Sequence, residues 1–214
     1  MSMLARLFAA ATLVASCVSA TAGGLAQTGS VYFHGEPGSW VSGAVGAPDA
    51  TWVHGVDGIF TVNTNFDQGA SISYEGDSWW RFDFAAPTYD PVTNTNNGQH
   101  LHVGLYSNAT RFPFNSPTKP GMDISGNGRG NNQESGWINV LEVTYVGNEI
   151  TSLAVDFRQF DESMTQTGPS LYGSLRINSS IPLTAVPEPA SVALLLAGLG
   201  VVALKRRRAA AVIA

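Results

Sequence analysis

Residues Trp79–Ala85 (WWRFDFA) carry large apolar side chains at every second position. Trp80, Phe82 and Phe84 would face one way, and the residues between them the other. Because successive side chains of a β-strand point to opposite faces, this spacing predicts a strand with one buried face. Residues 151–159 (TSLAVDFRQ) show the same pattern and predict a second such strand.

Short segments of the same period recur along the middle of the chain, separated by stretches rich in glycine, asparagine and aspartate. Further strands are expected at residues 59–63, 70–74, 100–105, 137–145 and 171–178. Outside the two apolar ends, no stretch keeps helical spacing. The sequence therefore predicts an all-β fold class: a single antiparallel β-sandwich or jelly-roll-like domain with an aromatic core.

Composition restricts the partners of this domain. The chain has 214 residues and a net charge of −5, but residues 23–185 hold six basic and fifteen acidic side chains, a net charge of −9. Nucleic acid and anionic membrane surfaces are therefore excluded as partners of the domain. The single cysteine, Cys17, excludes an internal disulfide framework and a thiolate zinc cluster.

The N-terminus has the features of a secretory signal peptide. Residues 7–15 (LFAAATLVA) form an apolar run too short to span a bilayer. Small residues follow at 20 and 22, which predicts cleavage between Ala22 and Gly23 and a signal peptide over residues 1–22. Residues 14–17 (VASC) leave an alternative open, since they resemble a lipobox that would make Cys17 a lipid-bearing first residue.

The C-terminus consists of three parts in sequence. The first is Pro187-Glu188-Pro189, and an uncharged run at residues 190–204 (ASVALLLAGLGVVAL) follows it. This run predicts a short transmembrane helix, below the about 20 residues of a comfortable span. A basic cluster then fixes the orientation with the preceding domain outside the cell. The cluster consists of Lys205, Arg206, Arg207 and Arg208.

This order of parts resembles the PEP-CTERM sorting signal of Gram-negative bacteria. The resemblance implies an exosortase as processing partner, after a signal peptidase has acted at the other end. It also implies an inner-membrane intermediate held by the C-terminal helix, followed by delivery to the cell surface or extracellular matrix. A simple membrane anchor is the alternative. The expected organisation is a signal peptide (1–22), an exported domain (23–185), a sorting signal (186–208) and a tail (209–214).

The exported domain also resembles a group of uncharacterised exported bacterial β domains. Segments at 36–43 (EPGSWVSG), 111–114 (RFPF) and 125–130 (SGNGRG) are among those that carry the likeness. In that group one cysteine follows the Gly-Arg-Gly and another follows the strand equivalent to residues 153–157. Here these places hold Asn131 and a residue near Asp161. The resemblance implies that the two loops approach each other without a disulfide.

Residues 123–134 (DISGNGRGNNQE) fit the spacing of a twelve-residue calcium loop. Oxygen ligands on alternate residues would converge around the ion, while Gly128 allows the sharp turn. The flanking sequence favours strand and coil over helices, so a structural hairpin loop, with Arg129 bonded to a nearby carboxylate or carbonyl, is the alternative. The candidate calcium ligands are Asp123, Ser125, Asn127 and Glu134.

Other side chains give weaker signals. His100 and His102 have the spacing of a metal pair on one strand, but a zinc site needs further ligands, so two solvent-facing histidines are expected instead. No catalytic motif is recognised, so the chain is not expected to be an enzyme. Aromatic residues could form a flat sugar-binding row, or could belong to the core, where most of them are expected. They are Trp40, Trp52, Trp79, Trp137 and Tyr172.

The sequence thus predicts a non-enzymatic exported protein of the cell surface or extracellular matrix, sorted by an exosortase. The alternative is a carbohydrate-binding module associated with extracellular polysaccharide, with or without calcium as cofactor. A secreted hydrolase would need two converging catalytic groups, and no residue pattern nominates them.

Overall fold

The computed structural model describes residues 24–45, 49–96 and 98–184. One short 3-10 helix, η1 (Ser42–Val45), accompanies the strands. The strands are β1 (Gly24–Leu25), β2 (Gly29–Gly35), β3 (Asp49–Val53), β4 (Gly58–Thr64), β5 (Ala70–Gly76), β6 (Trp79–Ala85), β7 (Tyr89–Asp90), β8 (Thr95–Asn96), β9 (Gly104–Arg111), β10 (Gly121–Gly126), β11 (Glu134–Val146), β12 (Glu149–Asp161) and β13 (Ser170–Ile177).

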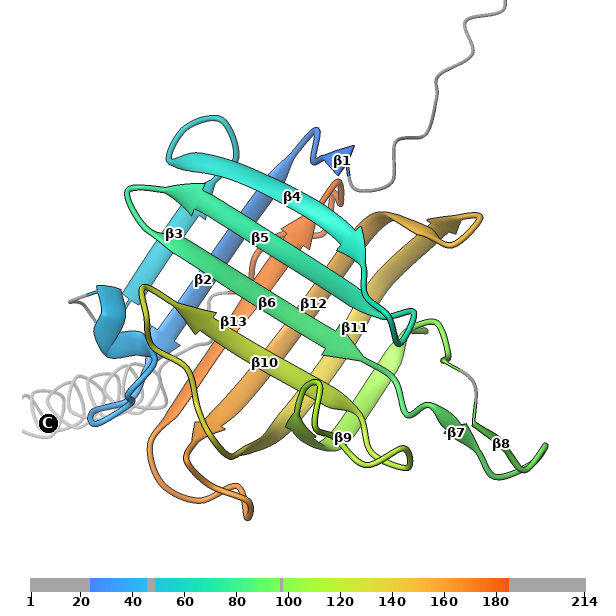
Figure 1. Cartoon of the computed structure of the whole chain (residues 1–214). Coiled ribbons are helices and arrows are strands. Elements are labelled where there is room, and N and C mark those ends of the chain that lie inside the picture. The colour runs from blue at the N-terminus through green and yellow to red at the C-terminus, as the bar shows by residue number, and fades with distance from the viewer. Residues whose placement is uncertain (1–23, 46–48, 97, 185–214) are drawn as a thin grey trace, which may run out of the picture.

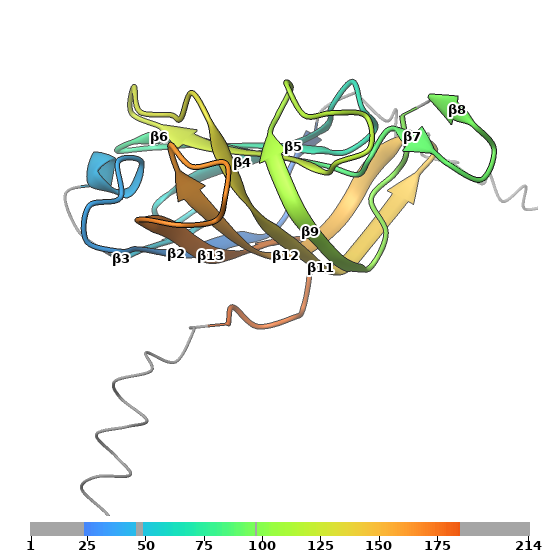
Figure 2. The same ribbon diagram turned by 90° about the horizontal axis from the view of Figure 1, so that it is seen from below.

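Eleven of these strands form one sheet in the order β1-β4-β5-β6-β10-β9-β11-β12-β13-β2-β3, and β7 and β8 form a small hairpin beside it (Figure 1). All neighbours in the large sheet are antiparallel except β9 and β10, which pair in parallel. The sheet curls strongly into a half-barrel, so that β4, β5, β6 and β10 lie over β11, β12, β13, β2 and β3 (Figure 2). We call these two layers the upper and lower halves.

The predicted all-β class is confirmed, and so are the strands expected at 59–63, 70–74, 137–145, 151–159 and 171–178. The two layers, however, are halves of one continuous mixed sheet. The strand expected at residues 100–105 is wrong, because β9 begins only at Gly104. Tyrosine hydroxyls take the place of strand partners there: Tyr145 accepts from the backbone N–H of Leu101 at 3.0 Å, and Tyr106 from that of His102 at 2.8 Å.

An aromatic core fills the space between the two halves. Trp80, Phe82 and Phe84 of β6 are buried as predicted, and Phe157 of β12 packs against two of them. Phe33 of β2 reaches Trp80 with ring centroids 4.8 Å apart. The alternation seen in the sequence therefore marks the inner faces of both halves.

The corner between the halves depends on a buried glutamine. β10 pairs with β9 only at Gly121 and Met122, which leaves the backbone N–H and C=O of Ile124 without a partner on β9. The side chain of Gln159 accepts a hydrogen bond from Ile124 N–H at 2.7 Å and donates one to Ile124 O at 3.0 Å. The amide of Gln159 thus replaces a neighbouring strand. Gly136 allows the close approach at the same corner, because a side chain there would overlap the backbone of Arg158.

No helix in the described ranges is long and apolar enough to cross a membrane. The predicted signal peptide (1–22), its cleavage site at Ala22 and Gly23, and the sorting signal (186–208) lie outside the described residues.

Candidate functional site

One row of side chains crosses the outer face of the lower half of the sheet. Trp137 of β11 lies opposite Ser107 of β9 and Arg158 of β12. Arg158 pairs with Tyr172 of β13, which in turn pairs with His34 of β2. Because paired residues on neighbouring strands point to the same face, these five side chains form one line, which we call the outer-face row.

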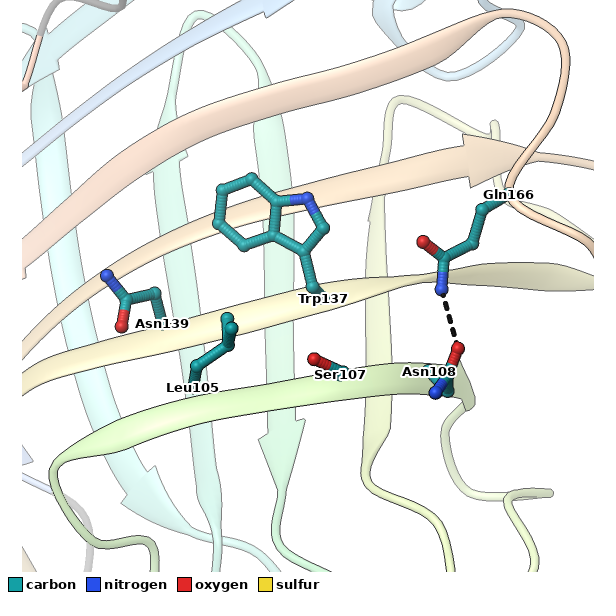
Figure 3. A pocket seen from close by; sticks show the side chains of 6 residues that line it. All are labelled: Leu105, Ser107, Asn108, Trp137, Asn139 and Gln166. Atoms are coloured by element: carbon teal, nitrogen blue, oxygen red, sulfur yellow. Dashed lines mark hydrogen bonds between the residues drawn. The ribbon is translucent and has the colours of Figure 1, made fainter.

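A groove lies along β9 and β11 on one side of Trp137, with a cavity volume of about 570 Å³. The indole of Trp137 projects from β11, and polar side chains lie around it (Figure 3). The lining combines one aromatic face with three carboxamides, a hydroxyl and an aliphatic side chain. The lining residues are Leu105, Ser107, Asn108, Trp137, Asn139 and Gln166.

The strands position this lining through an irregularity in their pairing. The register of β9 and β11 shifts between Gly136 and Trp137, and Asn108 at this bulge has a positive φ of 59°. Such a bulge turns its side chain away from the regular ladder. Gln166, from the loop between β12 and β13, donates to Asn108 Oδ1 at 3.1 Å, which closes one end of the groove (Figure 3).

A second hollow of about 270 Å³ lies on the other side of Trp137. Arg158 lines this hollow and is held there by the hydrogen bonds that it donates to Glu36 Oε1 at 2.8 Å and to Ser170 Oγ at 2.9 Å. The other lining residues are Glu36, Trp137, Asp156, Phe157, Tyr172 and Gly173. The indole of Trp137 is therefore shared by two adjoining hollows.

The far end of the outer-face row is fixed by a carboxylate. His34 packs on Tyr172 with ring centroids 5.0 Å apart, and its Nδ1 lies 2.8 Å from Asp49 Oδ1. The hydrogen bond from His34, with a second from Tyr32, holds the pKa of Asp49 below its usual value. The hydrogen bond to Asp49 therefore fixes the orientation of the His34 ring, and the face of this ring packs against Tyr172.

The predicted calcium loop has a different shape from the one expected. Asp123 and Ser125 lie on β10, and Asn127 sits in the turn after it with its Oδ1 accepting from Trp79 N–H at 3.1 Å. Glu134 begins β11 and is fully buried. Arg129 donates to the backbone carbonyl of Trp40 at 3.0 Å, which is the contact expected of a structural hairpin loop.

Burial dominates the electrostatics of the two carboxyl groups of this segment. It raises the pKa of Glu134 well above the usual value, and the negative charge of Asp123 raises it further. The neighbouring Asn131 amide and Arg111 act in the opposite direction. Burial also raises the pKa of Asp123, although Arg111 opposes this with its Nε 3.6 Å from Asp123 Oδ2.

The two loops compared above with a cysteine-containing group do approach each other. Asn131 Nδ2 donates to Asp161 Oδ1 at 3.0 Å, and both residues are buried. Asp161 Oδ2 accepts from Ser39 Oγ at 2.6 Å, so the carboxylate also ties in the segment before η1. The approach of the two loops without a disulfide is as the resemblance implied, and a hydrogen bond joins the two positions.

The predicted histidine pair is not formed as a strand pair. His100 stacks on Tyr145 with ring centroids 4.1 Å apart, whereas His102 is exposed. No three His, Cys, Asp or Glu side chains within the described ranges lie close enough together to hold a metal ion.

Most of the aromatic residues named from the sequence are outside the core, contrary to expectation. Trp52 alone of the five packs against the core, stacked on Tyr74 with centroids 4.6 Å apart. Trp40 and Trp79 are each 51% exposed, and Trp137 is half-buried in the outer-face row with Tyr172.

Sequence reasoning missed the polar lining of the groove. Ser107 comes two residues after Leu105, and Asn139 two residues after Trp137. Residues two apart on a strand share a face, so the sequence could have placed each pair together. Asn108 and Gln166 are brought in by a bulge and a distant loop, for which the sequence gives no signal.

The predicted sorting residues lie outside the described residues and were compared by sequence. They are Pro187, Glu188 and Pro189, with the basic cluster Lys205, Arg206, Arg207 and Arg208. No curated protein and no solved structure matches the chain. A family model described as a PEP-CTERM protein-sorting motif matches residues 185–209. The chain therefore carries a PEP-CTERM sorting motif, which implies export, processing by an exosortase and sorting to the cell surface.

Proposed function

We propose that the exported domain is a non-enzymatic component of the cell surface or extracellular matrix, delivered there through Pro187-Glu188-Pro189. The match over residues 185–209 carries this proposal. The domain also holds the chain in place shortly before the motif. Arg176 donates to the backbone carbonyl of Pro182 at 3.1 Å and to Thr184 Oγ1 at 3.2 Å. The motif thus begins within a few residues of a fixed point on the domain.

Intact-mass measurement of the protein recovered from the cell surface tests the sorting step. We expect a mature chain that lacks everything after Pro189. Substitution of Glu188 by Gln keeps the size of the motif, removes its charge and should leave full-length chain in the inner membrane. Recovery of surface protein with Arg206–Arg208 still attached would refute processing at this motif.

A second candidate function is glycan binding, and Trp137 is the observation that favours it. A sugar ring can pack its C–H face on an indole while its hydroxyl groups bond to neighbouring amides. The groove offers these amides in Asn108, Asn139 and Gln166, and Ser107 adds a hydroxyl. From Trp137 to His34 the outer-face row crosses three strand spacings, about 14 Å, which suits a polymer better than a single sugar.

Co-sedimentation of the mature protein with the producing cell's own polysaccharide tests this second function. Trp137→Ala should weaken retention about tenfold or more, an effect of ~1.4 kcal/mol or more. Trp79→Ala is the matched control, because Trp79 is a half-exposed indole outside the groove. Equal retention of both variants would remove the groove from consideration as the binding site.

A further inference from the structure

Glu134 is an unusual group to find inside the protein. Its side chain is 0% exposed, and neither carboxylate oxygen has a well-formed hydrogen bond in the described part of the chain, although the Asn131 amide lies near enough to favour the charged form. A buried carboxylate without partners is costly, because nothing replaces the water it has lost. Either a proton or a bound cation must therefore compensate this group.

Two further oxygens near Glu134 are in the same situation. Oδ1 of Asp123 and Oδ1 of Asn131 are buried and have no hydrogen-bond partner among the described residues. The bond from Asn131 Nδ2 to Asp161 fixes the amide and leaves its oxygen for another partner. Three side chains thus present four buried oxygens that could accept a hydrogen bond but have no well-formed one.

The fold places these three side chains near one another, since both Asp123 and Asn131 act on the charge of Glu134. The chain turns back immediately after β10, where Gly126 and Arg129 exchange backbone hydrogen bonds of 2.9 Å. A β-carbon on Gly130 would lie 3.3 Å from Cβ of Ser125, and one on Gly136 would lie against the end of the Met122 side chain. Residues 131–134 therefore run alongside the part of β10 that contains Asp123.

The surrounding charge calls for a cation. Glu134, Asp123 and Asp161 supply three carboxylates and Arg111, from β9, one positive charge, while the Arg81–Asp83 ion pair beside Asp123 adds no net charge. When all are ionised their net charge is −2, which one divalent ion neutralises. Asp161 is already engaged with Ser39 and Asn131, so the open oxygens belong to the other two carboxylates and the amide.

We propose that Asp123, Asn131 and Glu134 bind one calcium ion between β10 and the start of β11. All the open ligands are carboxylate or amide oxygens. Such ligands bind hard cations in preference to transition metals. Calcium accepts such irregular sets, with water completing about six to eight ligands, whereas magnesium demands a near-octahedral shell and gives up its water reluctantly. The set differs from the one predicted by loop spacing, because Asn131 takes the place of both Ser125 and Asn127.

Titration calorimetry on the mature protein, stripped with EGTA, tests this site directly. We expect one calcium ion per chain and much weaker binding of magnesium. In thermal unfolding, free calcium about 100-fold above Kd should raise Tm by roughly 5–10 °C. Absence of calcium binding to the stripped protein overturns the proposal.

Variants locate the ion. Glu134→Gln keeps the shape of the side chain and should weaken calcium binding at least tenfold. Glu162→Gln is the matched control, because Glu162 lies on the adjoining loop, is exposed and bonds Asn132, and it should bind like the parent. If Glu134→Gln does not fold, Asp123→Asn is titrated instead. If the variant, Glu134→Gln or Asp123→Asn, binds calcium as tightly as the parent, the proposed site is wrong. The site is also wrong if the stability of the parent depends on pH but not on calcium, because a proton shared by the carboxyl groups then takes the place of the ion.

Discussion

Replacement of Arg176 by alanine is expected to loosen the last described segment of the chain and to destabilise the domain. The side chain of Arg176 is 3% exposed, and all three guanidinium nitrogens donate hydrogen bonds. Nη1 bonds the carbonyl of Val155 at 2.9 Å within the lower half of the sheet. Nη2 bonds Asp156 Oδ1 at 2.8 Å, and Nε reaches Pro182 O. One side chain therefore joins β12 to the segment that leads to the sorting motif.

The size of the effect follows from what remains after substitution. Loss of one partner of a buried ion pair costs about 3–5 kcal/mol, because the other charge stays behind. The side chain of Asp156 is 20% exposed and can recover some water, so we expect the lower end, about 3 kcal/mol. For a domain of this size that corresponds to a fall in Tm of roughly 6–12 °C.

Thermal unfolding of the mature protein measures this loss, and limited proteolysis with mass mapping measures the release of residues 179–184. Arg176→Lys keeps the charge but loses the planar fork, so it should fall between alanine and the parent. Lys119→Ala is the control: Lys119 is exposed, and its loss should change stability by no more than about 0.5 kcal/mol. If Arg176→Ala unfolds within that same margin of the parent, the reasoning about this arginine is wrong.

Two further substitutions test the fold. Gln159→Leu should cost about 3 kcal/mol in thermal unfolding, since it leaves the buried N–H and C=O of Ile124 unpaired, whereas the exposed Gln133→Leu should be nearly neutral. Burial raises the pKa of Tyr145 to about 12, so its contribution to stability is complete below pH 10 and is lost as pH rises through 12. Tyr145→Phe should lack that portion of the alkaline loss in urea unfolding followed between pH 9 and 12, and an unchanged pH profile would contradict this assignment.

The inner faces of the strands were predictable because period two is a local property. Trp80, Phe82 and Phe84 needed only their own spacing to be placed in the core, and so did Val155 and Phe157. β10 escaped prediction because its sequence, GMDISG, offers only Met122 and Ile124 as apolar positions between glycines and polar residues.

The order of the strands was not predictable in the same way. β6 lies beside β10, and β2 beside β13, so these neighbours are distant in sequence and share no pattern that identifies them. The corner depends on one polar contact, between Gln159 and the backbone of Ile124, where an apolar residue would have seemed equally suitable. This is why one curled sheet was expected as two separate layers.

The candidate sites combine local and distant residues, and only the local part was within reach of the sequence. Asp123 and Glu134 were recognised together because twelve-residue spacing relates them, whereas the proposed third ligand, Asn131, was not among the residues that this spacing selects. Asn131 is selected by its bond to Asp161, thirty residues away, and Asn127 is taken by the backbone of Trp79. Spacing alone assumes a loop that wraps around its ligand, whereas here the chain pairs with itself as strand and turn.

The end of the domain and the outer-face row are linked by geometry. After β13 the chain folds back over the outer side of the lower half, where Ser174 Oγ donates to Thr184 O at 3.1 Å (Figure 2). Asp156, which lines the hollow beside Trp137, is bonded by Arg176 and lies 3.5 Å from Thr184 Oγ1. Only three residue steps separate Thr184 from Pro187, at most about 11 Å of extended chain. Thr184, the last described residue before the sorting motif, therefore lies beside the proposed glycan-binding face.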